Sequence, residues 1–423
     1  MKLVIVGAGS SYTPELISGV IAQYEIMPFA EICLMDVDER RLEILAGLTR
    51  RMLHSAGLPV RVTAVTERRR ALEGATFVNC LIRVGGMAAR INDERIPLKY
   101  NVIGQETTGP GGMMKALRTI PPMLELAKDM TEVCPETWLI NYTNPSGIIA
   151  EALAKYGVGR GGRAVRFVGL CSGPDGWCRH ILDCMGVEPS RANVDWMGLN
   201  HLGFAVRVWV DGRDATAQAV EAVADRWSID GEWLRTLGVI PATYLAYYYH
   251  HLAVVQEAQQ PGRPTRGEQV QEIEAELLRQ YADPQLCAKP PLLSKRGGGG
   301  YAEVALAAMA AIYHNRGERQ IVQVPNQGAI DGIPPDASVE VPCIVDRTGA
   351  HPIRMGPLPL PIRGLVQAVK AYESLTVQAA VEGSRRVAMQ ALMAHPLVPS
   401  WQVAKPLLEE LLAANQPWLP WAG

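Results

Sequence analysis

Residues 2–16 read KLVIVGAGSSYTPEL, and this stretch decides the fold. The apolar run at 3–6 predicts a β-strand, the two glycines after it predict a tight turn, and Thr13-Pro14 is typical of a helix start. In such a strand–turn–helix unit the glycines let the backbone approach a pyrophosphate, which the helix N-terminus stabilises. We expect a serine hydroxyl to cap this helix. The residues that we place at a bound dinucleotide are Gly7, Gly9, Ser10 and Ser11.

The turn motif by itself is weak, because Tyr12 stands where the usual third glycine would be. An ordinary tight βα turn therefore remains an alternative. Asp36 strengthens the dinucleotide interpretation, since it ends a second apolar run at 31–35. An acidic residue at that place binds the adenosine ribose hydroxyls and favours NAD over NADP.

Outward from this unit, apolar strands alternate with helical segments. Further strands are predicted at 62–65, 77–82, 138–140 and 167–170, and helices at 38–54 and 114–130. This alternation predicts an α/β fold with a parallel, doubly wound sheet of the Rossmann type.

After about Val194 the pattern changes. Residues 203–210 alternate and end in Asp211-Gly212, a hairpin signal, while residues 220–282 are mainly helical. The glycine loop at 296–300 precedes a helix that begins near Tyr301, and the C-terminal third is again helical. We therefore divide the chain into an NAD-binding domain at 1–194 and a mixed α+β domain at 195–423 for substrate, metal and oligomer contacts.

The composition excludes several classes of protein. Hydrophobic residues make up 48% and charged residues 20%, which is typical of a globular enzyme. A formal net charge of −2 gives no support for binding nucleic acid or a membrane surface. No apolar run reaches the roughly 18 residues of a membrane span, and the N-terminus does not resemble an export signal. We expect reduced cysteines and a cytoplasmic protein.

A polar segment rich in arginine and glycine follows the strand at 77–82. Arg83, Arg90 and Arg95 lie within it, and arginine forms bidentate contacts with phosphate or carboxylate. Asn141 and Asn144 flank a later turn and offer amide groups to sugar hydroxyls or to nicotinamide. The segment predicts a pocket for an anionic substrate beside the nicotinamide, and we assign Arg83 to the cofactor.

Cys171 and His201 both follow apparent strands, at the edge where open α/β sheets bind ligands. A thiolate and an imidazole with open positions suit Mn, Fe, Co or Ni, completed by substrate oxygens and water. The alternatives are two structural residues, or a zinc site formed with Cys178, His180 and Cys184, whose spacing fits no common zinc pattern.

Tyr301 comes directly after the glycine loop. A metal and a cationic neighbour such as Arg296 would lower its pKa enough for it to act as a base. The alternative is an aromatic side chain that packs on the core.

The chain resembles glycoside hydrolase family 4, in its 6-phospho-β-glucosidase branch. The motifs that carry the resemblance span residues 1 to about 345 and read GAGSSYTPEL, DVDERRL, RVGG to GPGG, NYTNPSGI, GLC, GLNHLG, IPxxYLxYYY, KRGG with Tyr301, VPNQGAI and VEVP.

The resemblance implies a fold like that of lactate and malate dehydrogenases, bound NAD, a divalent metal that is usually Mn, and a homodimer or homotetramer. It also implies an exception to the usual two-carboxylate mechanism of glycosidases. Hydride passes from sugar C3 to NAD, a base removes the C2 proton, the aglycone is eliminated, water adds and the hydride returns. The implied reaction is hydrolysis of 6-phospho-β-glucosides.

By position in the motifs, the resemblance makes Cys171 and His201 metal ligands and Tyr301 the base. It makes Arg95 and Asn144 substrate contacts, with Arg319 as a weaker match. Two residues depart from the family pattern. After the metal cysteine, the α-specific branch commonly has Asp and the β-specific branch has Asn followed by Val-Pro, whereas Ser172-Gly173-Pro174 follows here. The absence of an α-type acid favours β-glycosides and leaves Glu106 or Asp175 to assist through water. Ala246 replaces a common basic residue, so one anion contact is lost.

Three alternative functions remain open from the sequence. The chain could be a related glycosidase that acts on 6-phospho-α-glucosides or on unphosphorylated sugars. It could be an NAD-dependent hydroxy-acid dehydrogenase, for which His201 with Arg95 is the available pair. It could also be a non-catalytic NAD-binding regulator.

Overall fold

The first strand of the chain forms the centre of a parallel sheet, as the sequence predicts. The computed structural model describes residues 1–226, 230–297 and 299–422. In it β1 lies between β2 and β4, and the order β6-β5-β4-β1-β2-β3 is parallel throughout. The strands of this half are β1 (Lys2–Val6), β2 (Glu31–Met35), β3 (Arg61–Val65), β4 (Phe77–Cys80), β5 (Trp138–Asn141) and β6 (Arg166–Gly169).

Helices cover both faces of this parallel half. Helices α1 and α2 pack together with α13 against α1, whereas α5, α6 and α14 form a second group. Right-handed crossover connections place such groups on opposite faces of a sheet, so the doubly wound prediction is confirmed. The helices of the first half are α1 (Thr13–Ala22), α2 (Glu39–Ser55), α3 (Arg68–Leu72), α4 (Gly86–Leu98), α5 (Gly109–Val133), α6 (Ser146–Tyr156) and α7 (Gly173–Met185).

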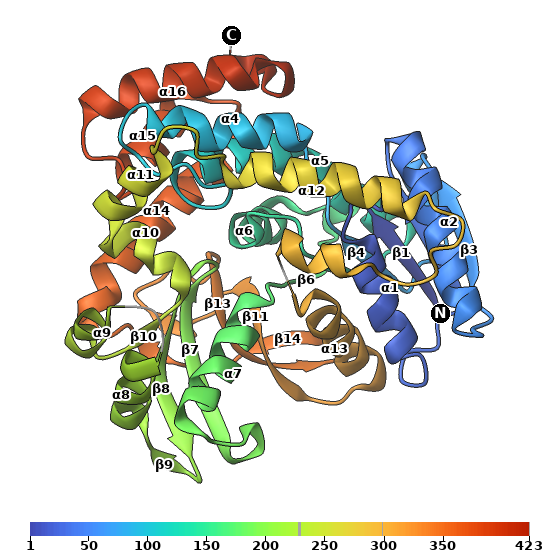
Figure 1. Cartoon of the computed structure of the whole chain (residues 1–423), viewed down its shortest axis with the longest axis horizontal. Helices are drawn as coiled ribbons and strands as arrows, with labels where there is room; N and C mark the ends of the chain where they lie inside the picture. The colour runs from blue at the N-terminus through green and yellow to red at the C-terminus, as the bar shows by residue number, and fades with distance from the viewer. Residues whose placement is uncertain (227–229, 298, 423) are drawn as a thin grey trace.

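Apart from a small sheet in which β12 pairs with β15, the strands of the second half extend the first sheet. Antiparallel β11 joins the edge of β6, and β13, β7, β8 and β10 continue the same sheet (Figure 1). The domain boundary predicted at 194/195 therefore falls inside β7. The strands of this half are β7 (Ala192–Leu199), β8 (Leu202–Val210), β9 (Arg213–Asp214), β10 (Ile240–Pro241), β11 (Glu318–Pro325), β12 (Ile330–Asp331), β13 (Ser338–Asp346), β14 (Gly349–Pro352) and β15 (Gly356–Pro357).

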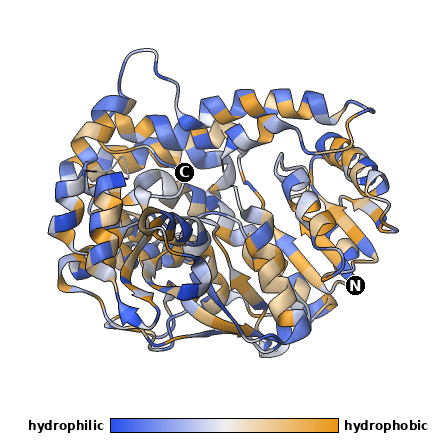
Figure 2. Cartoon of the chain, turned by 60° about the horizontal axis from the view of Figure 1, so that its bottom comes forward, coloured by the Kyte–Doolittle hydropathy of each residue, from blue (hydrophilic) through white to orange (hydrophobic). Residues whose placement is uncertain are grey.

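Long helices pack around this extended sheet. Helix α12 runs across the molecule and packs against both α4 and α2, and α16 packs back on α4 and α5 (Figure 1). Hydrophilic and hydrophobic residues alternate along the outer helices, as expected where one face is buried (Figure 2). The helices of this half are α8 (Thr216–Arg226), α9 (Gly231–Leu237), α10 (Ala246–Tyr249), α11 (His251–Ala258), α12 (Arg266–Tyr281), α13 (Tyr301–His314), α14 (Leu360–Glu382), α15 (Arg385–Ala394) and α16 (Trp401–Asn415).

Most predicted elements are present with small shifts at their ends. Residues 220–282 are mainly helical, except for short β10, but residues 227–229 within the prediction lie outside the described part. Gly298 of the glycine loop also lies outside it, while α13 begins at Tyr301 as expected. Among the described helices, none combines the length and apolar character needed to cross a bilayer.

Candidate active site

The turn after β1 has the geometry of a dinucleotide-binding loop. Gly7 adopts a φ of +87°, and an added Cβ would lie 3.0 Å from the backbone of Leu81 and Ile82, so only glycine fits without strain. An added Cβ on Gly9 would lie 2.8 Å from the carboxylate of Asp36. The two glycines thus let the chain after β4 and the Asp36 carboxylate pack directly against the turn, which is the tight turn that a dinucleotide-binding motif needs.

Asp36 lies where an acidic residue binds an adenosine ribose. Its Oδ2 accepts a hydrogen bond from the Gly9 amide at 2.7 Å, and its Oδ1 accepts from the Asp38 amide at 2.9 Å. The carboxylate is thus fixed at the carboxyl end of β2, beside the turn. This arrangement supports the predicted NAD site and its preference for NAD over NADP.

The predicted serine cap of α1 is wrong. Tyr12 is the N-cap residue and makes no side-chain cap, while Ser10 Oγ accepts from the Tyr12 amide at 3.2 Å. Ser11 is fully buried and donates to Glu274 of α12 at 2.9 Å. The Ser11 side chain therefore contacts α12, whereas the half-buried Ser10 hydroxyl, which only accepts here, still has a proton to donate.

The structure brings Cys171 and His201 together. The Cys171 sulfur lies 3.7 Å from His201 Nε2. Sulfur and nitrogen ligands of one tetrahedral ion, at bond lengths of about 2.3 and 2.1 Å, lie about 3.6 Å apart. The pair therefore fits a single divalent ion. In the described residues no group of three or more His, Cys, Asp or Glu side chains could hold a metal, so further ligands would come from substrate or water.

Local structure explains how each member of this pair is presented. Cys171 lies between the end of β6 and the start of α7, at the carboxyl edge of the parallel sheet. His201 lies in the two-residue turn between β7 and β8, with a left-handed φ of +62°. Histidine tolerates this conformation better than a branched residue does, but at some cost in energy.

A hydroxyl group fixes the orientation of the His201 ring. The Thr107 hydroxyl donates to Gln105 Oε1 at 2.8 Å, so it accepts from His201 Nδ1–H at 2.6 Å. Nε2 then keeps its lone pair toward the Cys171 sulfur, which is the tautomer that a metal ligand needs. Nothing in the sequence analysis singled out Thr107, although it lies inside the GPGG motif block.

Burial keeps both members of the pair uncharged in the metal-free protein. It lowers the pKa of His201 to about 4, so the ring is neutral near pH 7. It also raises the pKa of Cys171 to about 12, with Glu340 as the next contributor. A metal ion binding here would therefore have to displace the thiol proton.

Three cations converge on one carboxylate next to Thr107. Glu106 pairs with Arg83 at 2.5 Å, with Arg90 at 3.0 Å and with Lys115 at 2.6 Å. Burial alone would raise the pKa of Glu106, but Arg83, Lys115 and Arg90 hold it well below its usual range. Glu106 is therefore not the proton donor that the sequence allowed. Arg90 also pairs with Glu94 at 2.8 Å, and burial lowers the pKa of Lys115 to about 7, so the cluster keeps only a small net positive charge near neutral pH.

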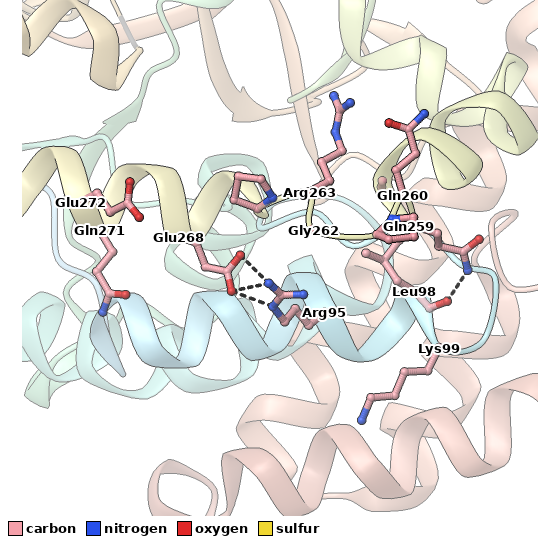
Figure 3. Close-up of a pocket in the computed structure, with 13 residues that line it drawn as sticks. Arg95, Leu98, Lys99, Gln259, Gln260, Gly262, Arg263, Glu268, Gln271 and Glu272 are labelled. Carbon is pink, nitrogen blue, oxygen red and sulfur yellow. Dashed lines mark hydrogen bonds and ion pairs between the residues drawn. The ribbon is translucent and has the colours of Figure 1, made fainter.

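Arg83 and Arg95 differ from their predicted places. Arg83 follows the backbone that Gly7 contacts, but its side chain turns to Glu106. Arg95 is half exposed and forms a bidentate pair with Glu268 of α12 (Figure 3). It lines a surface pocket of about 690 Å³ between α4 and the segment that leads into α12. The structure therefore places Arg90, and not Arg95, with the Glu106 cluster, because the two arginines lie on different faces of α4.

Of the other two predicted substrate contacts, Asn144 lies near the site and Arg319 does not. Asn144 lies just beyond β5, where its Oδ1 accepts from the Ser146 amide at 3.3 Å. It remains beside the carboxyl ends of the central strands. Arg319 instead lies near the start of β11, where it donates to the Val194 carbonyl at 2.9 Å. Gln323, which lies on the site side of β11, is four residues or about 13 Å further along the strand, so Arg319 does not face the pair.

Tyr301 and Arg296 do not form the predicted base and its cation. The Tyr301 ring packs against Tyr142 with centroids 3.8 Å apart, and its hydroxyl accepts from buried Asn79 at 3.4 Å. Arg296 lies over the ring of Tyr12 at 4.3 Å and pairs with Glu274. Burial raises the pKa of Tyr301, opposed only in part by Asn79.

A different tyrosine lies against the proposed metal pair. The Tyr244 ring stacks on the His201 imidazole, with centroids 4.2 Å apart and planes 23° from parallel. Burial and then Cys171 raise its pKa. Tyr244 belongs to the YLxYYY motif that the sequence analysis quoted, but it was not assigned a role. The motif contains four tyrosines, and its sequence gives no indication of which one faces the site.

The remaining sequence alternatives gain little support. Cys184 lies 3.7 Å from His180, but these residues do not extend into a three-ligand zinc group within the described chain. Ser172 precedes α7, and Asp175 in its first turn has a pKa raised by burial. Asp175 is thus a better proton donor than Glu106 from this part of the molecule.

Family models match nearly the whole chain. The model for family 4 glycosyl hydrolases matches residues 2–187, and that for the C-terminal domain of the same family matches residues 196–398. The chain belongs to glycosyl hydrolase family 4. The resemblance stated from the motifs is therefore confirmed.

Individual relatives agree with the family assignment. A probable 6-phospho-beta-glucosidase of Bacillus subtilis (strain 168) is 43% identical, over 99% of this chain and 97% of that protein. The structure of the 6-phospho-beta-glucosidase from Thermotoga maritima with manganese, NAD+ and glucose-6-phosphate has a TM-score of 0.90, at 32% identity over 99% of both chains. A malate dehydrogenase of Plasmodium falciparum, at 13% identity over 90% of this chain and 99% of its own, has a TM-score of 0.51. That last likeness concerns the fold alone, and it confirms the dehydrogenase-like fold.

Proposed function

We propose that this family 4 enzyme hydrolyses 6-phospho-β-glucosides with the help of NAD and a divalent metal, most simply Mn. The observation that carries the proposal is the 3.7 Å approach of Cys171 and His201 at the carboxyl edge of a dinucleotide-binding sheet. The similarity to 6-phospho-beta-glucosidases over the full chain supports the substrate class. When bound, NAD supplies a hydride acceptor and the metal supplies a Lewis acid.

The residues around the pair divide the work. Cys171 and His201 hold the metal, and Thr107 keeps the imidazole in the tautomer that leaves Nε2 free. The backbone at Gly7 and Gly9 receives the pyrophosphate, and Asp36 receives the ribose hydroxyls. This arrangement does not require the pair of catalytic carboxylates that other glycosidases use.

Tyr244 is the better placed proton acceptor for sugar C2, and Tyr301 is the alternative. The phenol of Tyr244 lies beside the metal ligand, whereas the hydroxyl of Tyr301 is held by Asn79. The raised pKa of Tyr244 means that the phenol keeps its proton until a cation at Cys171 and His201 offsets the effect of burial.

The charge around Glu106 supports a phosphorylated substrate. Arg83 and Arg90, with a partly protonated Lys115, outweigh the carboxylates of Glu106 and Glu94 by a small margin, and arginine suits phosphate geometry. Asn144 is retained as a contact to sugar hydroxyls. Ser172 supports the β-anomer, since a hydroxyl cannot act as a general acid near neutral pH.

The proposal is tested with 4-nitrophenyl glucosides. We expect nitrophenol release from the 6-phospho-β-glucoside that requires both added NAD and Mn²⁺. The 6-phospho-α-glucoside and the plain β-glucoside serve as matched controls. Equal rates on the plain glucoside would refute the phosphate assignment, and net accumulation of NADH with a hydroxy acid would favour the dehydrogenase alternative.

The proposal extends to location and assembly. Each of the eight cysteines has no disulfide partner, which suits a reducing cytoplasm. Large apolar side chains are exposed at Leu252, Leu360 and Trp401, and such residues are common at subunit interfaces. We expect a homodimer or homotetramer, and light scattering coupled to size-exclusion chromatography would reveal a monomer if that is wrong.

A further inference from the structure

A buried carboxylate lies behind the Cys171–His201 pair. Glu340 of β13 is fully buried, and in the part of the chain that the structure describes it has no salt-bridge partner. Its contacts are three neutral donors: Trp196 Nε1 at 3.0 Å, Asn200 Nδ2 at 3.1 Å and Gln323 Nε2 at 2.7 Å. Burying a carboxyl group without a cation is costly, so an arrangement of this kind indicates a specific role.

Asn200 connects this carboxylate to the turn that carries His201. Its amide nitrogen donates to Glu340 at 3.1 Å. Its carbonyl oxygen accepts from the Gly147 amide at 3.4 Å. Since Asn200 directly precedes His201, the hydrogen bonds of this one side chain fix the turn that carries the second proposed ligand.

The turn needs such an anchor. His201 has a left-handed φ of +62°, a conformation that costs a non-glycine residue about 1 kcal/mol or more. Only two residues join β7 to β8 here, so any movement of Asn200 would rotate the imidazole. The hydrogen bonds of Asn200 hold the turn in the conformation that presents Nε2 to the sulfur.

Gln323, another donor to Glu340, links this carboxylate to the segment that carries Cys171. Gln323 donates to Glu340 through Nε2 and accepts from the Ser146 hydroxyl through Oε1 at 2.6 Å. The single proton of the Ser146 hydroxyl is shared with the carbonyl oxygen of Leu170, the residue before Cys171, at 3.3 Å. Glu340 therefore ties together the segments that carry Cys171 and His201 from two directions.

We propose that Glu340 is a positioning residue, which sets the separation and orientation of Cys171 and His201 through Asn200 and thereby sets the affinity for the divalent metal. The inference rests on the proposed function, because it requires that this pair binds the metal. The inference adds to the proposed function a role for Glu340, a residue that touches neither metal nor substrate.

A glutamine cannot replace this carboxylate. Glu340 accepts three N–H donors on two oxygens, and glutamine would turn an NH₂ group toward at least one of those donors. Glu340→Gln keeps the volume and removes the acceptor. Asn200→Ser keeps a small polar residue and removes the link.

The test measures Mn²⁺ binding directly, by the electron paramagnetic resonance signal of free Mn²⁺ in titrations of metal-free enzyme. Outer partners of metal ligands typically contribute 10- to 100-fold in affinity, so we expect E340Q and N200S each to raise the Kd by about 10-fold. The double variant should be no worse than N200S alone, because both act through one chain of contacts. Titration with Co²⁺ should show a weakened thiolate-to-metal charge-transfer band in both variants.

A matched control separates positioning from general destabilisation. Glu151 is also a fully buried glutamate, but its side-chain partners are Lys155, Lys370 and Ser374, and its one contact with β13 is the backbone amide of Ser338. E151Q should leave the Kd for Mn²⁺ within twofold of the parent value. If E151Q weakens Mn²⁺ binding as much as E340Q does, or if folded E340Q binds Mn²⁺ like the parent, the proposal is overturned. If E340Q does not fold, N200S decides in its place.

A second pair of variants distinguishes failure of this inference from failure of the proposed function. C171S and H201A should each abolish Mn²⁺ binding and the Co²⁺ charge-transfer band. If they do not, the metal assignment itself is wrong and Glu340 has no pair to position. If they do while E340Q is silent, only the role of Glu340 is refuted.

Discussion

Replacing Tyr244 and Tyr301 by phenylalanine separates the two candidate bases. Tyr244→Phe removes one hydroxyl and leaves the ring stacked 4.2 Å from the His201 imidazole, so metal binding should be unchanged. Loss of a positioned general base typically costs 10²- to 10⁴-fold in rate, or about 3 to 5 kcal/mol in the activation barrier. Tyr301→Phe removes only a 3.4 Å hydrogen bond from Asn79, which is worth about 1 kcal/mol of stability.

The assay compares kcat and kcat/KM on 4-nitrophenyl 6-phospho-β-glucoside, with protio and C2-deuterated substrate. Y244F should lose at least 100-fold in kcat with an unchanged Kd for Mn²⁺, and its remaining rate should show a larger isotope effect. Y301F should keep kcat within about fivefold and unfold a few degrees earlier. The opposite pattern, with Y301F inactive and Y244F active, would refute the geometric argument and restore the base expected from the motif.

Three further predictions follow from the same contacts. Arg90→Lys should raise KM for the phosphorylated glucoside by about 10-fold, because a bidentate donor is lost. Arg95→Lys should leave KM within twofold of the parent value. Equal effects of the two substitutions would contradict the placement of Arg95 outside the site. Thr107→Val should weaken Mn²⁺ binding by about 10-fold, since His201 Nδ1–H loses its acceptor, and an unchanged Kd would remove Thr107 from the site. Burial would raise the pKa of Glu151, but Lys370 and neighbouring hydroxyl and amine groups lower it to about 2. The stabilising contribution of Glu151 is therefore present above the unfolded pKa near 4.5 and is lost as pH falls toward 2. The free energy of unfolding should fall by up to about 1.4 kcal/mol per pH unit in that range. Urea titrations at pH 3 to 6 should show this dependence in the parent protein and a smaller one in E151Q.

Local patterns were sufficient for the parallel half of the fold. The run at 3–6 with Gly7 and Gly9 encodes a strand and a turn within a few residues, and Asp36 marks the end of the next strand. Such signals depend on neighbours in the sequence, so they can be interpreted without the tertiary structure. The antiparallel β11 joining β6 depends on pairing between residues about 150 positions apart, which no local pattern contains.

Site residues that lie at strand ends could be predicted from the sequence. Residues whose contacts depend on the face of a helix that they occupy could not. Cys171 and His201 follow strands and were placed correctly beside each other. Arg90 and Arg95 occur in the same motif, but only their faces on α4 show which one reaches Glu106. Spacing could not show that Tyr244 stacks on His201.

Contacts between residues far apart in the sequence were the hardest to predict. Thr107 is 94 residues from His201, and Glu340 is 140 residues from Asn200. Neither residue type is unusual in its local context. The folded sheet brings β13 beside β7 and so makes the hydrogen bond between Glu340 and Asn200 possible, whereas Thr107 reaches His201 from the loop between α4 and α5.

Hydrolysis in deuterated water tests the central claim most directly, because removal of the C2 proton requires a ketone at C3 and hence both the dinucleotide and the metal pair. The glucose 6-phosphate formed from a 6-phospho-β-glucoside should carry solvent deuterium at C2, and C171S and H201A should form none. Product with only hydrogen at C2, formed at full rate without added NAD or Mn²⁺, would contradict the account.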